Sequence, residues 1–239
     1  MMVDFSGLVI LVGNYGSGKT EVAVNLALHQ CRAGKKVQIA DLDLVNPYFR
    51  TREADELLTG WGVEVIVPEK RLKHADLPIL VPQIGGMIRA PRDLAILDVG
   101  GNNVGAMVLA ALSDHLAGQA VQMLQVVNPY RPFTETAAGC QKIRREIEAA
   151  AGLTVTGLIG NPNLMNETTL ENIRSGYRFL MDLSEISELP LESLAVAQEF
   201  VPDLEKIGII CPILPLQRQL VFPWQNKRAP AAPVFKALG

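Results

Sequence analysis

The stretch that decides the fold reads Leu8-Val9-Ile10-Leu11-Val12-Gly13-Asn14-Tyr15-Gly16-Ser17-Gly18-Lys19-Thr20. Its last eight residues fit the pattern G-x-x-x-x-G-K-[ST], which wraps backbone N–H groups around a phosphate when a strand precedes it and a helix follows it. Both conditions are met: an apolar run comes before the pattern, and apolar residues repeat with helical period after it. The stretch therefore predicts a strand, a phosphate-binding loop and a helix, in that order.

The residue types of this loop predict a nucleotide with a bound cation. The helix that follows directs the positive end of its dipole at the same anion as the loop. Lys19 is expected to reach the β- and γ-phosphates, and the Thr20 hydroxyl to coordinate Mg²⁺. We therefore predict ATP (or ADP) and Mg²⁺ as cofactors.

Two acidic positions follow strand-like runs elsewhere in the chain. Asp98 ends the run Leu94-Ala95-Ile96-Leu97, and Asp41 and Asp43 end the run Val37–Ala40. In open α/β folds the carboxyl ends of the strands form the ligand site. We assign Asp98 to the magnesium shell, Asp41 to that shell through water and Asp43 to orienting the attacking water. Asp98 as the cap of the next helix, and Asp41 with Asp43 as a turn cap, remain open alternatives.

The rest of the chain alternates short apolar runs with segments of helical period, which indicates βα units and a largely parallel sheet covered on both faces. The runs expected to be strands are Leu8–Val12, Val37–Ala40, Val63–Val67, Leu94–Val99, Val121–Val127, Val155–Ile159 and Ile209–Leu214. Proline and glycine between Pro68 and Pro91 predict an irregular region or short elements only. We expect one domain over residues 1–220 and a proline-containing tail over 221–239.

Composition excludes several classes of function. A formal charge of -3 gives no global attraction to nucleic acid or anionic lipid, so neither partner is expected. The three cysteines, Cys31, Cys140 and Cys211, have neither disulfide nor zinc-site spacing. The N-terminal apolar run is far shorter than a membrane-spanning helix. We expect a soluble, cytoplasmic protein.

Together, the loop, the Asp41-Leu42-Asp43 segment and Asp98-Val99-Gly100-Gly101 resemble the deviant-Walker ATPases of the SIMIBI class, such as the Min and Par partitioning ATPases and the nickel-insertion ATPases. The resemblance implies a three-layer P-loop NTPase fold, α/β with a mostly parallel central sheet flanked by helices. It also implies that Asn161 hydrogen-bonds adenine and that Pro215 and Leu216 pack on the base. Asn161-Pro162-Asn163-Leu164 lacks the Lys and Asp of a guanine-reading N-K-x-D motif, which disfavours a GTPase.

The chain departs from that class at two loop positions. Asn14 stands where such proteins carry a signature lysine that reaches across a dimer interface, and Tyr15 stands where they usually carry glycine. An asparagine cannot supply the charge of that lysine. Both a monomer and a homodimer therefore remain open, and slow or partner-stimulated hydrolysis is expected.

Three further segments carry aromatic or basic residues outside the motifs described above. The segment Asp43 to Arg52, which holds Asn46–Arg50, lies where the resembling proteins carry their first switch, so it is a candidate partner-reading device; a buried aromatic pair with a solvated Arg is the open alternative. Arg131 is a candidate contact for phosphate or an acidic substrate. The basic cluster Lys70-Arg71-Lys73-His74 is interpreted as a solvated face.

We predict a nucleotide-dependent switch, or an accessory or maturation factor, for an unidentified protein partner. The alternatives are an ATP-dependent synthetase or kinase acting on a small molecule, of the dethiobiotin synthetase or cobyrinate amidase type, and a regulatory module with little turnover. The residues assigned to the nucleotide are Gly13, Asn14, Tyr15, Gly16, Ser17, Gly18, Lys19, Thr20, Glu21, Gly101, Asn161, Pro215 and Leu216. Thr20, Asp41 and Asp98 are assigned to the metal, and Lys19 and Asp43 to catalysis.

Overall fold

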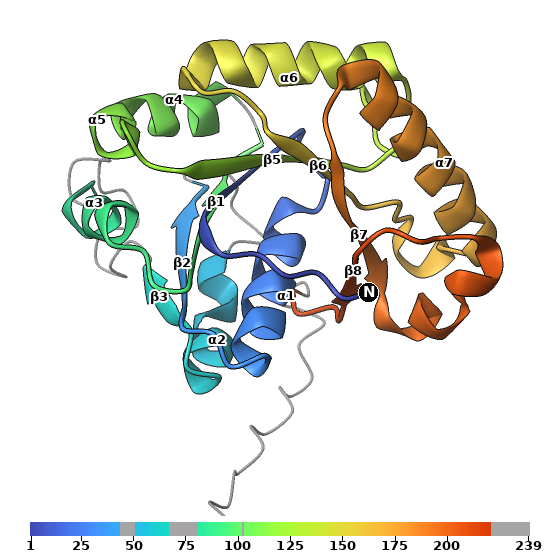
Figure 1. Ribbon diagram of the computed structural model, residues 1–239, viewed down its shortest axis with the longest axis horizontal. Helices are drawn as coiled ribbons and strands as arrows, with labels where there is room; N and C mark the ends of the chain where they lie inside the picture. The colour runs from blue at the N-terminus through green and yellow to red at the C-terminus, as the bar shows by residue number, and fades with distance from the viewer. Residues whose placement is uncertain (44–50, 67–80, 102, 221–239) are drawn as a thin grey trace, which may run out of the picture.

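The computed structural model describes residues 1–43, 51–66, 81–101 and 103–220, which form a central sheet between layers of helices (Figure 1). The strands are β1 (Gly7–Val12), β2 (Val37–Leu42), β3 (Glu64–Ile66), β4 (Leu94–Val99), β5 (Val121–Val127), β6 (Gly157–Gly160), β7 (Leu191–Ala197) and β8 (Ile213–Leu216). The α-helices are α1 (Lys19–Arg32), α2 (Asp55–Gly60), α3 (Val81–Arg89), α4 (Asn103–Ala111), α5 (Ser113–Leu116), α6 (Ala137–Ala151) and α7 (Leu170–Ser187). Short 3-10 helices cover Thr51–Ala54, Met165–Glu167, Gln198–Asp203 and Glu205–Ile207.

The strands of the described residues pair in parallel, in the order β3-β2-β4-β1-β5-β6-β7-β8. This confirms the predicted α/β fold with a parallel central sheet. Because β1 lies between β4 and β5, the segments that follow these three strands leave the same edge of the sheet side by side. That edge is where parallel sheets bind ligands.

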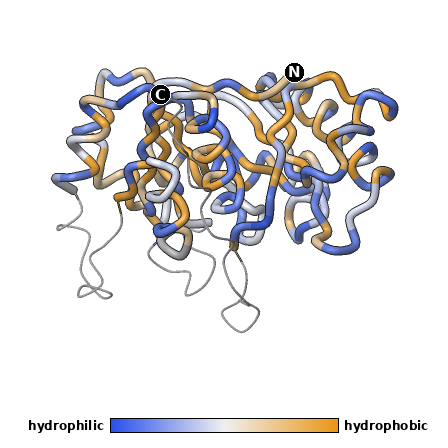
Figure 2. Tube along the Cα trace, turned by 90° about the horizontal axis from the view of Figure 1, so that it is seen from below, coloured by the Kyte–Doolittle hydropathy of each residue, from blue (hydrophilic) through white to orange (hydrophobic). Residues whose placement is uncertain are grey.

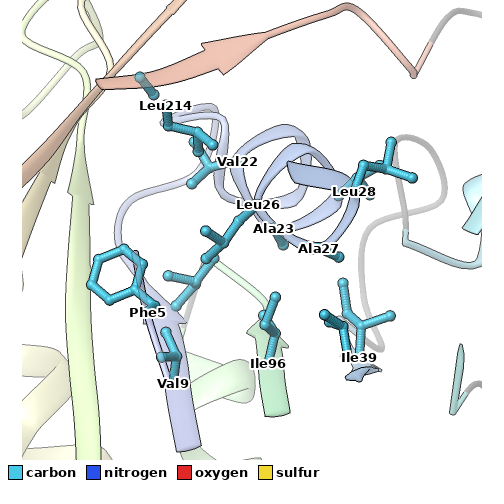
Figure 3. Packing of buried hydrophobic residues seen from close by; sticks show 14 of the residues in the cluster. Phe5, Val9, Val22, Ala23, Leu26, Ala27, Leu28, Ile39, Ile96 and Leu214 are labelled. Atoms are coloured by element: carbon cyan, nitrogen blue, oxygen red, sulfur yellow. The ribbon is translucent and has the colours of Figure 1, made fainter. Parts of the chain in front are cut away.

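Both faces of the sheet are buried, as the continuous apolar runs predicted. On one face, α1 covers the odd-numbered side chains of β1, and Figure 3 shows Val22, Ala23 and Leu26 of α1 above Val9 and Ile96. On the other face, Leu8 and Ile10 pack with residues of α3, α4 and α5. Figure 2 shows hydrophobic segments concentrated in the middle of the molecule and hydrophilic stretches mainly around it. This burial removes apolar surface from water and fixes the position of α1 beneath the loop that precedes it.

Two strand predictions were wrong. β7 was missed because Glu192 and Ser193 interrupt its apolar residues, although residues 193–196 are buried. The last strand runs over Ile213–Leu216 instead of Ile209–Leu214, and Pro215 lies within it. β8 is an edge strand, where a proline without an N–H group costs no ladder hydrogen bond.

Two further predictions concern the region between Pro68 and Pro91 and the C-terminal tail. The region between Pro68 and Pro91 carries a short element, α3, and residues 67–80 lie outside the described part of the chain. The predicted tail 221–239 also lies outside it. Within the described residues, no helix combines the length and the apolar content needed to cross a bilayer.

Candidate functional site

The loop between β1 and α1 is closed by its own backbone. The Ser17 N–H donates to the Asn14 carbonyl at 3.2 Å, and α1 begins at Lys19. Gly18 has a left-handed φ of 88°, and a Cβ atom there would lie 2.3 Å from Nδ2 of Asn161. Any other residue at position 18 would therefore force either the loop or Asn161 to move. The loop has the strand-before, helix-after setting that phosphate binding requires.

Lys19 points its ammonium group into the loop. Its side chain is buried, and Nζ donates to the Asn14 carbonyl at 2.9 Å. Burial lowers the pKa of Lys19, while the neighbouring carboxylates of Asp98 and Asp43 oppose that change. The cation therefore lies between the loop and the acidic ends of β2 and β4, where an incoming phosphate would meet it.

Asp41 and Asp98 lie side by side, because they are direct neighbours in the register of β2 and β4. Both are buried. The Thr51 hydroxyl donates to Oδ2 of Asp98 at 2.8 Å, and Oδ1 of Asp98 is buried with no hydrogen-bond partner among the described residues. Burial, followed by the charge of Asp41, raises the pKa of Asp98 to about 7. Two buried carboxylates side by side, one with an oxygen left over, suit a hard divalent cation.

The segment after β4 packs directly on this cluster. A Cβ atom at Gly100 would lie 3.0 Å from Oδ1 of Asp43, whose own N–H donates to Oδ1 of Asp41 at 3.0 Å. A Cβ atom at Gly101 would lie 2.7 Å from Nζ of Lys19 and 2.8 Å from the backbone nitrogen of Tyr15. The contact at Gly101 leaves no room for a methyl group, so Gly101 touches the phosphate loop through its backbone.

The residues predicted to contact adenine are Asn161, which follows β6, and Pro215 and Leu216, which lie in β8. Asn161 follows β6, is buried, and donates from Nδ2 to the Ser17 carbonyl at 2.8 Å, while its Oδ1 has no hydrogen-bond partner among the described residues. In this structure Asn161 braces the phosphate loop. Pro215 and Leu216 lie within β8, and the Leu216 side chain is buried in the core against α1.

Glu21 contacts the segment that follows β8. Its carboxylate accepts the N–H of Gln219 at 2.6 Å and the N–H of Leu220 at 3.2 Å. One helical turn later, Asn25 donates to the Gln217 carbonyl at 3.0 Å and accepts the Gln217 N–H at 2.8 Å. Burial raises the pKa of Glu21, and the two backbone donors lower it in turn. Residues 217–220 are thus tied to the helix that carries the phosphate loop.

The first two interior positions of the loop have different environments. Asn14 donates from Nδ2 to the Pro132 carbonyl at 2.8 Å, and its Oδ1 accepts the Tyr15 N–H. Tyr15 as a whole residue is 70% exposed. Tyr15 is thus exposed to solvent, and Asn14 is bonded to the segment after β5. Of the predicted site residues, the structure brings Lys19, Asp41, Asp43, Asp98 and Gly101 together.

Sequence reasoning missed Thr51, the donor to Asp98, and the segment 217–220 held by Glu21 and Asn25. Neither had a signal, since Thr51 has no motif around it and residues 217–220 follow a strand whose end was misplaced. The candidate switch Asn46–Arg50 and the basic cluster over Lys70–His74 lie outside the described residues.

Comparison with known proteins gives distant relatives. No family model matches the sequence. The chain is similar to the cytosolic Fe-S cluster assembly factor NUBP2, at 25% identity over 175 residues in the chicken protein and over 179 residues in the human protein. In both cases the match covers 64% of this chain and 64% of the relative, so it spans just under two thirds of each relative's length.

Among solved structures, the fold is similar to that of the cell division protein FtsY from Thermotoga maritima, with a TM-score of 0.54 and 20% identity over 82% of this chain and 64% of that chain. It is also similar to the signal recognition particle receptor FtsY from Elizabethkingia anophelis in complex with GDP, with a TM-score of 0.52 and 19% identity over 82% of this chain and 59% of that chain. At these identities the likeness concerns the fold alone.

The phosphate loop lies between β1 and α1 at the carboxyl edge of a parallel sheet, with acidic residues ending the two strands on one side of it. A fold and a site of this kind define a P-loop nucleotide-binding protein. Its similarity in sequence to the assembly factors supports the predicted resemblance to the SIMIBI class of P-loop NTPases, and the receptors share its fold.

Proposed function

We propose that this chain binds ATP with Mg²⁺ and uses the nucleotide state to change its contact with a partner protein, as an accessory or maturation factor. The observation that carries the proposal is the contact of Gly101 with Tyr15 and Lys19. A backbone segment lying against the phosphate loop must respond when a γ-phosphate arrives there. This is the kind of segment that nucleotide switches order and release.

The acidic cluster supports magnesium as the cation. Thr20, at the start of α1, and Asp98 would hold the ion directly, and Asp41 would hold it through water. The cation would hold Asp98 in its ionised form, even though burial and Asp41 raise its pKa to about 7. Asp43, beside Gly100, is the residue we assign to orienting the attacking water. ATP is proposed over GTP because Asn161-Pro162-Asn163-Leu164 lacks the guanine-reading residues.

The assembly-factor relatives suggest the class of partner, namely a protein that receives an iron–sulfur cluster. The three cysteines lie far apart in the sequence, with no C-x-x-C pair, which supports a role in acting on such a partner without carrying a cluster. Burial raises the pKa of Cys140 to about 12 and that of Cys211 to about 11. Cys31 donates from Sγ to the Trp61 carbonyl.

The test compares the wild-type chain with Lys19→Ala and with the control Lys142→Ala, which removes an exposed lysine on α6. Calorimetric titration with MgATP should show binding for the wild type and the control, and a loss of about 100-fold or more for Lys19→Ala. Affinity capture from cells should then recover a set of proteins that differs between ATP and ADP for the wild type only. Equal MgATP affinity in all three proteins would contradict the site, and identical captured proteins in both nucleotide states would contradict the switch.

A further inference from the structure

The segment after β5 is held rigidly beside the phosphate loop. The Asn128 carbonyl accepts the Arg131 N–H at 3.2 Å and the Thr134 hydroxyl at 2.7 Å. The Thr134 N–H donates to the Arg131 carbonyl at 3.1 Å. The Tyr130 hydroxyl donates to the Asn172 carbonyl of α7 at 2.6 Å. These bonds fix the backbone of Arg131 before any ligand binds.

Asn14 ties this segment to the loop. Its Nδ2 donates to the carbonyl of Pro132, the residue next to Arg131, at 2.8 Å. Asn14 is the position at which the resembling ATPases carry a lysine. Here the side chain at this position holds a neighbouring segment that itself carries a cation.

Arg131 lies against the loop, and its Nε atom has no hydrogen-bond partner among the described residues. Its Cδ and Nε atoms lie 3.9 Å from the Cβ position of Gly16, and Nε is buried with no hydrogen-bond partner among the described residues. A buried guanidinium nitrogen without a partner is costly, and a phosphate oxygen is the partner that a guanidinium fits best. The half-buried side chain is therefore placed for a ligand that enters the loop.

The position of Arg131 selects one phosphate. Gly101 follows β4, Arg131 follows β5, and β1 lies between those two strands. From these two sides they approach Tyr15 and Gly16, which are adjacent residues of the loop. A terminal phosphate that extends from the loop towards the Gly101 backbone would therefore have Arg131 on its opposite side. In the proposed function this is the γ-phosphate.

We propose that Arg131 binds the terminal phosphate of the nucleoside triphosphate within the same chain, and that Asn14 is the positioning residue that holds it there. This rests on the proposed function, since it needs a nucleotide in the loop. Arg131 supplies the charge that position 14 lacks. The site then distinguishes ATP from ADP without a second copy of the chain.

The experiment measures calorimetric affinities for Mg²⁺ with ADP and with a non-hydrolysable ATP analogue. Arg131→Ala should weaken the triphosphate about tenfold or more and change ADP less than about twofold, because only the triphosphate has the group that Arg131 contacts. Arg131→Lys should retain part of the preference, since it keeps the charge but not the planar fork. Arg145→Ala, at an exposed position on α6, is the matched control and should match the wild type.

Asn14→Ala removes the tether and no charge, so it should weaken the triphosphate in the same direction but less. The double variant should lose no more than Arg131→Ala alone, because both changes act through one contact. Circular dichroism and melting curves check the folding of every variant. If Arg131→Ala does not fold, Arg131→Gln takes its place.

Equal losses for ADP and the triphosphate, or no loss for either, would overturn the assignment of Arg131. Wild-type protein that binds neither nucleotide would instead overturn the proposed function. The two failures are therefore distinguishable.

Discussion

Replacing Asp98 with asparagine separates the charge of this buried group from its shape. The amide keeps an oxygen that accepts the Thr51 hydroxyl bond and removes the negative charge beside Asp41. The pKa of Asp98 is about 7 in the folded chain against a usual 3.8. Between these two values the folded protein binds one proton more than the unfolded chain. The free energy of unfolding of the ligand-free wild type therefore falls as the pH rises through this window.

The size of the effect follows from the same two values. The pKa of Asp98 is raised by about three units, and each unit corresponds to about 1.4 kcal/mol. Above pH 7 the free energy of unfolding of the ligand-free wild type is therefore lowered by on the order of 4 kcal/mol. Asp98→Asn does not have this loss. Its melting temperature at pH 8, without nucleotide or metal, should exceed that of the wild type by roughly 10 °C for a chain of this size. At pH 5.5 the advantage in free energy should shrink to about 2 kcal/mol.

Thermal melts of the ligand-free proteins at both pH values measure the difference, with Asp182→Asn as a control at an exposed position on α7. Addition of MgATP should raise the melting temperature of the wild type and leave Asp98→Asn nearly unchanged, because the variant lacks a metal ligand. An advantage that does not change between pH 5.5 and pH 8, or an asparagine variant less stable than the wild type at pH 8, would refute the electrostatic argument.

Two further substitutions test the contacts around the loop. Gly101→Ala places a methyl group 2.8 Å from the Tyr15 nitrogen and should lower the MgATP affinity at least about tenfold. Gly60→Ala, where a Cβ atom meets nothing within 4 Å, is the control, and equal affinities would contradict the contact. Glu21→Gln weakens the bonds to the Gln219 and Leu220 N–H groups, so hydrogen exchange of these two amides should accelerate roughly tenfold, whereas Glu146→Gln on α6 should leave them unchanged. Unchanged exchange in the Glu21 variant would show that the carboxylate does not hold this segment.

The sequence predicted the parts of the fold whose signal is local. A continuous apolar run identifies a strand buried on both faces, and β1, β4 and β5 were found in this way. β7 carries Glu192 and Ser193 within its run and could not be distinguished from a loop by pattern alone. β8 contains Pro215, which argues against a strand unless its edge position is already known.

In the site, the sequence located residues that belong to a motif and missed residues that are brought in by packing. Thr51 and Asp98 are 47 positions apart, and Asn14 and Pro132 are 118 positions apart. No periodicity links such pairs, because their proximity results from strand order and from the paths of two loops. From the sequence, Asn14 could be interpreted only as the loss of a lysine charge. Its hydrogen bond to the Pro132 carbonyl depends on β1 and β5 being neighbours in the sheet.

Hydrogen bonds from α1 connect the phosphate loop to the segment that follows β8. The helix begins at Lys19, and within two turns Glu21 and Asn25 bind residues 217–220, almost 200 positions further on. Within the loop itself, Asn161 donates to the Ser17 carbonyl and Asn14 donates to the Pro132 carbonyl. A phosphate that draws Lys19 away from the Asn14 carbonyl therefore acts on a helix whose first turns are bonded to the segment after β8. Displacement of the loop by even a fraction of an ångström would strain hydrogen bonds on three separate segments, because packed elements move as units. In the proposed function, this arrangement would carry the effect of a bound phosphate from the loop to the segment after β8.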